Sequence, residues 1–227
     1  MTSATCATCL QTVTKNQMRR HLRQCPGEGN GMLLEVTNAG APKSYLLYLS
    51  AAPDATLGEL DALLRAVWLE CCRHLSSFEV GGRGGLRYES HSYDDFDWDV
   101  DQPQGFDQLV ATALPPETTA VYEYDFGTTT TLDVCRHEQP VRAPSGAPVQ
   151  LLARNLAPEI GCQLCGAAAS LADWQRVLCE ACWRGLGEDE REMLLPLCNS
   201  PRAGLCGYDG SYDPYAGGVQ LVVAGPN

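Results

Sequence analysis

Residues 56–72 read TLGELDALLRAVWLECC and carry the clearest helix signal in the chain. Thr56, followed three positions later by Glu59, forms a capping-box pattern, which predicts that a helix begins here. Apolar residues then recur at helical spacing, at Leu57, Leu60, Leu64, Val67 and Cys71. The stretch therefore predicts one amphipathic helix with a single side turned toward a core.

Strand signals surround this helix. They lie at residues 32–36, 45–49, 77–80, 86–89, 121–126 and 132–134. The glycine cluster at residues 81–85 predicts a hairpin turn rather than a phosphate loop, because no helix follows it. Helix and strands together predict an α+β fold, with a central mixed α/β-sheet domain flanked by two small zinc-binding modules.

A first set of metal ligands lies near the start of the chain. Cys6 and Cys9 form a Cys-x-x-Cys pair, and His21 and Cys25 follow four residues apart on a predicted helix over residues 15–24. Two thiolates on a knuckle and two ligands on one helical face complete a tetrahedral zinc shell. The spacing is similar to that of small C2HC zinc fingers and predicts one Zn²⁺ in residues 1–26.

A second set of ligands lies near the other end. Two Cys-x-x-Cys pairs are separated by thirteen residues, and the four ligands are Cys162, Cys165, Cys179 and Cys182. Four thiolates leave no open position for water, so this Zn²⁺ is predicted to be structural rather than hydrolytic. Two pairs at this spacing favour zinc over redox exchange. A predicted helix over residues 183–197 would complete a treble-clef or zinc-ribbon module over residues 158–199.

The remaining cysteines fit neither pattern. The chain has 12 cysteines and no secretory signal, which favours metal binding over disulfides. Cys71 and Cys72 end the predicted helix at residues 56–72, and we interpret them as buried small apolar residues. The spacing of the other three cysteines assigns them no role; these are Cys135, Cys198 and Cys206.

Charge divides the chain unequally. The net charge is -12, yet residues 1–25 carry four basic residues and no acidic one, so this segment is +4 and the remainder is -16. Such a balance excludes a general nucleic-acid binder. The basic side chains are candidate contacts for either nucleic acid or an acidic protein surface, and they are Lys15, Arg19, Arg20 and Arg23.

Composition also predicts boundaries and location. A Pro- and Gly-rich linker at residues 26–31 separates the first module from a central domain at residues 32–140, and a second linker at residues 140–148 precedes the C-terminal cysteine-rich region. Residues 200–227 are predicted to be irregular. No run approaches the ~20 apolar residues of a membrane helix, so we predict a cytoplasmic protein.

Alternating aspartates at residues 95–101 do not match a calcium loop. They predict an exposed strand edge that a basic partner could contact.

Catalytic motifs are weak in this sequence. It contains no nucleophile elbow and no paired-histidine metal motif, and we interpret His74, His91 and His137 as structural. We identify no catalytic residue and infer no small-molecule substrate. The favoured hypothesis is a non-catalytic zinc-binding adaptor that contacts nucleic acid or protein, and the alternative is an enzyme with a cleft between the central and C-terminal domains.

The central region resembles a known family. Residues 56–60, the stretch His74-Leu75-Ser76-Ser77-Phe78 and the motif Tyr124-Asp125-Phe126-Gly127 are similar to the plasmid pRiA4b ORF-3-like family over roughly residues 32–140. The motif combines an aromatic strand end, a carboxylate that bonds backbone and a turn glycine. Threonines at residues 128–131 replace the aspartate, tryptophan and histidine that often follow in that family. The resemblance implies an α+β domain of unestablished activity in a mobile-element setting.

Overall fold

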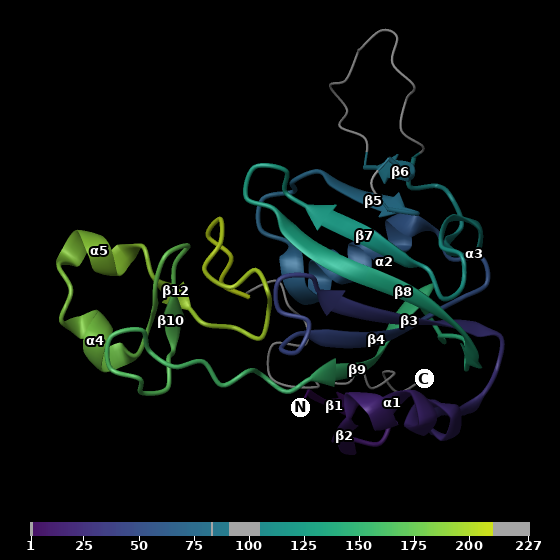
Figure 1. Cartoon of the computed structure of the whole chain (residues 1–227), viewed down its shortest axis with the longest axis horizontal. Helices are drawn as coiled ribbons and strands as arrows, with labels where there is room; N and C mark the ends of the chain where they lie inside the picture. Colours follow the sequence, from purple (N-terminus) through teal and green to yellow (C-terminus); the bar gives the residue numbers. More distant parts are fainter. Residues whose placement is uncertain (1, 83, 91–104, 211–227) are drawn as a thin grey trace, which may run out of the picture.

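The computed structural model describes residues 2–82, 84–90 and 105–210 (Figure 1). Helices and strands are mixed, as the sequence predicts, and most strands belong to one antiparallel sheet. The aspartates at residues 95–101, His91 and the chain beyond residue 210 lie outside the described residues. None of the helices in the described ranges is both long and apolar enough to cross a membrane.

Nine strands of the described chain form the main sheet, in the order β2-β1-β9-β4-β3-β8-β7-β5-β6, and every neighbouring pair is antiparallel. The predicted strands of the central region are present, including the hairpin across residues 81–85. The strands are β1 (Ser3–Cys6), β2 (Thr12–Thr14), β3 (Gly31–Asn38), β4 (Leu46–Ala51), β5 (Ser76–Val80), β6 (Leu86–Glu89), β7 (Thr119–Tyr124), β8 (Thr130–Val141) and β9 (Val149–Asn155).

The predicted central helix is confirmed up to residue 69. It consists of α2 (Leu57–Leu64) and a wider turn, η2 (Arg65–Leu69). The Thr56 hydroxyl accepts the Glu59 amide at 3.3 Å, and the Glu59 carboxylate accepts the Thr56 amide at 2.9 Å, so the capping box forms as predicted. The apolar side of this helix packs on one face of the sheet, with the short helix α3 (Val110–Ala113) beside it (Figure 1).

The N-terminal segment covers part of the opposite face of the sheet, over β9, β4 and β3. Helix α1 (Lys15–Leu22), with the turn η1 (Arg23–Gly27), buries Met18 and Leu22 completely. Alternate residues of β4 therefore serve two cores: Leu47 and Leu49 face α2, and Leu46 and Tyr48 face α1. This explains why every residue of β4 is buried.

Strands β1 and β9, which the sequence did not predict, join the first cysteine-rich segment to the sheet. Strand β9 pairs with β4 on one side and with β1 on the other. The segment thus shares both hydrogen bonds and a core with the central region, although composition suggested a unit set apart by a linker. Residues 3–14 and the sheet form one continuous structure.

The second cysteine-rich region is a separate small sheet, formed by β10 (Leu171–Ala172), β11 (Val177–Leu178) and β12 (Leu195–Pro196). The continuous helix predicted over residues 183–197 is wrong. The chain instead forms α4 (Glu180–Arg184) and α5 (Glu188–Glu192), because Gly185 ends the first helix and Gly187 precedes the second. This region lies to one side of the main sheet in Figure 1.

Candidate metal centres

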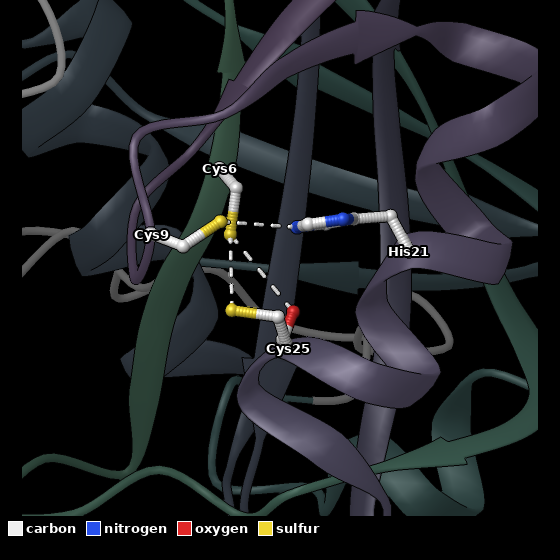
Figure 2. A group of neighbouring side chains, drawn as sticks. All are labelled: Cys6, Cys9, His21 and Cys25. Carbon is white, nitrogen blue, oxygen red and sulfur yellow. Dashed lines mark hydrogen bonds between the residues drawn. The ribbon is translucent and has the colours of Figure 1, made fainter.

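The four predicted ligands of the first site converge. Cys6 ends β1, Cys9 lies in the following turn, His21 lies on α1 and Cys25 lies in η1. Their ligand atoms all lie within 4.8 Å of one another, with Cys9 Sγ 3.4 Å from His21 Nε2 and Cys6 Sγ 3.9 Å from Cys25 Sγ (Figure 2). Zinc bonds of 2.0–2.3 Å in a tetrahedron place ligand atoms about 3.3–3.8 Å apart. The four side chains are therefore arranged so that they could hold a metal ion.

Local structure explains this convergence. The Ala7 amide donates to Leu152 O of β9, and the Leu10 amide donates to Cys6 O, so the cysteine knuckle is fixed to the sheet. A Thr14–Gln17 capping box begins α1. Because Met18 and Leu22 point into the core, the helix presents His21 toward the two cysteines.

Thiol ionisation shows why a cation fits this site. Burial, followed by the neighbouring Cys9 and Cys6 sulfurs, raises the pKa of the Cys25 thiol to about 12. Crowded sulfurs disfavour several thiolates together, whereas a divalent cation stabilises them. No disulfide joins any of the twelve cysteines. The donor set therefore fits a bound metal ion.

The second predicted set also converges. Cys162, Cys165, Cys179 and Cys182 have ligand atoms within 4.8 Å of one another, and Cys165 Sγ lies 3.6 Å from Cys179 Sγ. The knuckle closes through the Gly166 amide, which donates to Cys162 O at 2.8 Å, and Cys179 caps α4. Hydrogen bonds from backbone amides, that of Cys179 first, lower the pKa of the Cys162 thiol to about 6. Hydrogen bonding with the Cys165, Cys179 and Cys162 sulfurs raises the pKa of the Cys182 thiol to about 12, so several thiolates together would be stabilised by a cation, as in the first centre.

The four basic candidates divide into two pairs. Lys15 Nζ lies 2.7 Å from Glu35 Oε1, and Arg19 lies 3.8 Å from Glu117. Arg20 and Arg23 are exposed, and no ion pair to them occurs among the described residues. The structure therefore uses two of the predicted contacts to attach α1 to the sheet and leaves two facing solvent.

His137 belongs to this attachment. It is buried on β8, with Nε2 3.4 Å from Glu35 and Nδ1 3.3 Å from Glu117. Although burial opposes it, hydrogen bonding by His137 and then Lys15 lowers the pKa of Glu35 to about 2. Cys135 lies in the same group of side chains, and burial raises its pKa. Since the His137 ring already has two carboxylate partners, we interpret this group as a structural network.

Sequence reasoning missed one cluster. Cys72 was predicted to be buried and is exposed, so that interpretation is wrong; Cys71 is half-buried. Both lie with His74 and Cys206 in a group whose ligand atoms are within 4.8 Å of one another. The Cys-Cys-x-His order at residues 71–74 was a local signal for it, but Cys206 is distant in sequence.

Comparisons with known proteins give little beyond this geometry. No family model matches the chain, and no curated protein matches it. Among solved structures, a crystal structure of a protein of unknown function from Methanosarcina mazei Go1 is similar to it, with 17% sequence identity and a TM-score of 0.42. The match covers 55% of this chain and 68% of that one. The resemblance to the pRiA4b ORF-3-like family stays a prediction.

Proposed function

We propose that this protein is a non-catalytic binding protein stabilised by zinc, and that the exposed face formed by α1 and the start of η1 contacts nucleic acid. The observation that carries the proposal is the closure of both predicted ligand sets into groups of four. Four protein ligands fill a tetrahedral zinc shell and leave no position for a reacting water. The metals would then hold surfaces in place rather than perform chemistry.

Arg20 and Arg23 are the residues most suited to nucleic acid. Arg20 borders a shallow hollow beside the first metal centre, whose lining is Gln11, Val13, Gln17, Arg20, His21 and Gln24. Guanidinium groups match phosphate geometry, and glutamine amides both donate and accept hydrogen bonds. The acidic remainder of the chain, which carries -16 by formal count, would limit contact to this face.

This proposal predicts a small salt dependence. Lys15 and Arg19 are already paired with carboxylates, so two arginines remain to neutralise phosphates. Neutralising two phosphates gives a slope of log affinity against log salt of about -1.8 on duplex DNA and about -1.4 on a single strand. A general DNA binder with many contacts would have a much steeper slope.

The test measures binding of the zinc-loaded full chain to labelled single- and double-stranded oligonucleotides by fluorescence anisotropy across a potassium chloride series. We expect the double variant Arg20→Ala/Arg23→Ala to lose binding. The matched control Lys43→Ala/Arg73→Ala removes two exposed positive charges elsewhere, neither of which forms an ion pair among the described residues, and it should retain binding. No binding of the unchanged chain at low salt, or equal losses in both variants, would contradict a nucleic-acid role and leave an acidic protein surface as the partner to test.

An enzymatic function has less support. A hollow near the start of the connection to the second metal region is lined by Thr2, Ser3, Lys43, Ser44, Leu156 and Pro158. This lining includes no carboxylate, histidine or cysteine, so it lacks the convergent titratable groups that general acid–base catalysis uses. We therefore keep binding as the proposed function.

A further inference from the structure

A third cluster of thiols and one imidazole lies where the C-terminal segment meets the central sheet. His74 Nε2 is 3.2 Å from Cys206 Sγ, although the two residues are 132 positions apart, and the Cys71 and Cys72 sulfurs lie in the same group. Three cysteines and one histidine are the donor set of the first centre. We propose that Cys71, Cys72, His74 and Cys206 bind a further Zn²⁺, which clamps the C-terminal segment to the central region.

The backbone is shaped to bring these side chains together. Cys71 and Cys72 follow η2, and Arg73 takes a left-handed conformation with φ 60° while its amide donates to Glu70 Oε1 at 2.6 Å. This reversal returns His74 toward the cysteines. On the other side, Cys206 also has a positive φ, 47°, and Gly207 continues the turn. The two short turns thereby face each other.

Arg202 links the cluster to the Tyr-Asp-Phe-Gly motif. Its side chain is fully buried, and its guanidinium donates to Asp125 Oδ2 at 2.6 Å and to Thr128 O at 2.9 Å. The same guanidinium has two nitrogens 3.4 Å from Cys71 Sγ. The guanidinium therefore donates hydrogen bonds to this sulfur, and outer contacts of this kind orient metal ligands.

The other polar groups around the cluster are compatible with a cation. Asp125 Oδ2 lies 3.6 Å from His74 Nε2, but this carboxylate already accepts Arg202. The Tyr124 hydroxyl lies 3.9 Å from Cys71 Sγ. Thiolate and imidazole donors select zinc over calcium or magnesium, which prefer oxygen. Cys72 and Cys206 are exposed, so a metal ion can reach this site from solvent.

The clamp has a clear structural role. The C-terminal segment is anchored by Ser200 Oγ, which donates to Trp68 O at 2.6 Å, and by Arg202. Beyond Arg202 the chain runs through short turns to Cys206 and belongs to no described helix or strand. A metal bond at Cys206 would fix this segment to the loop between η2 and β5, which holds Cys71, Cys72 and His74. The proposal adds a centre to the two in the proposed function and does not depend on nucleic-acid binding.

The test counts metal in the full chain. Protein purified with zinc under reducing conditions is desalted and measured by inductively coupled plasma mass spectrometry. We expect three equivalents in the unchanged chain, two in Cys206→Ser and three in the control Cys198→Ser, which changes a cysteine of the same segment outside the cluster. Hydrogen exchange should accelerate across residues 200–208 in Cys206→Ser and stay unchanged in Cys198→Ser.

Two outcomes would overturn the third site. The first is that Cys206→Ser releases no zinc while Cys9→Ser and Cys165→Ser each release one equivalent, a result that leaves the proposed function intact. The second is that protein purified without reductant lacks two free thiols by titration and regains them on reduction, with peptide mapping that joins Cys72 to Cys206 and with no third zinc bound. Cys72 and Cys206 would then form a disulfide rather than a metal site.

Discussion

The two predicted metal centres have nearly the same donor chemistry but very different support from the rest of the fold. Around the first centre, β1 forms hydrogen bonds with both β2 and β9, and ten buried residues from the N-terminal segment and the sheet form one apolar cluster. Around the second, the strands are two residues long, and the buried cluster is Cys162, Leu178, Cys179 and Leu194. Two of those four, Cys162 and Cys179, are candidate ligands themselves. A Cys-x-x-Cys pattern therefore does not reveal whether metal is the main source of stability.

The energetic consequence differs between the regions. A module with so small a core cannot offset the conformational entropy of its own chain, so we expect metal binding to supply its folding free energy. Structural zinc contributes about 10–16 kcal/mol in isolated finger peptides. The first region also has sheet hydrogen bonds and buried apolar surface, which persist without metal. We therefore expect the second region to fold only when zinc is bound. The first region should stay folded without zinc but be less stable.

The largest expected effect comes from replacing one equivalent candidate ligand in each centre and comparing the two variants. Cys165 and Cys9 are both exposed and both second in their knuckle. Cys165→Ser should unfold residues 160–198 and leave the main sheet intact, whereas Cys9→Ser should lower stability while β1 remains paired with β9. Hydrogen exchange measured by mass spectrometry checks this. Similar loss of protection around both centres would show that the first region depends on metal as much as the second.

The elements that could be predicted are those with local signals. The Thr56–Glu59 capping box and the leucine repeat define α2 without reference to any other part of the chain. Asp125 likewise bonds backbone as the motif indicated, since its Oδ1 accepts the Gly127 and Thr128 amides. The two paired-cysteine ligand sets are equally local, and their spacing placed each group of four together.

The elements that were missed depend on distant partners. Strand β9 is buried on both faces, so its sequence VQLLARN does not alternate in polarity, and β1 is short and rich in small residues. Strand β9 forms by pairing with the edge of β4, and β1 forms by pairing with the outer edge of β9. Cys206 joins Cys71 and Cys72 only through the docking of the C-terminal segment. Spacing along the chain contains no information about such contacts.

A smaller effect tests the apolar support of the first centre. Leu22 is fully buried between α1 and the sheet, one residue after His21. Leu22→Ala should lower the free energy of unfolding of the whole chain by about 2–5 kcal/mol, because it leaves a cavity in a shared core. Leu194→Ala, the matched change in the second region, should affect that region alone. Urea titration at neutral pH with zinc present measures both. If Leu22→Ala costs under about 1 kcal/mol, the support of the first centre is metal and not packing.

The smallest effect is a pH dependence specific to the first region. Hydrogen bonds from His137 and Lys15, acting against burial, lower the pKa of Glu35 from 4.5 to about 2. A carboxylate with a depressed folded pKa contributes stability above its unfolded pKa and loses it as pH falls through the folded value. Glu35→Gln should therefore be less stable than the unchanged chain by about 2 kcal/mol at pH 7, and the difference should shrink between about pH 4.5 and pH 2.

Urea titrations of the two proteins at each pH, with equal excess zinc so that acid release of metal affects both alike, measure this difference in the free energy of unfolding. Glu59→Gln is the matched control, because Glu59 caps α2 and does not contact α1. It should leave the acid dependence of the first region unchanged. A Glu35→Gln difference that stays constant down to pH 2 would mean that Glu35 holds α1 by hydrogen bonding alone, without a contribution from its charge. The polar attachment of the first centre would then differ little from an uncharged contact, and its stability would rest on Leu22, Met18 and the pairing of β1 with β9.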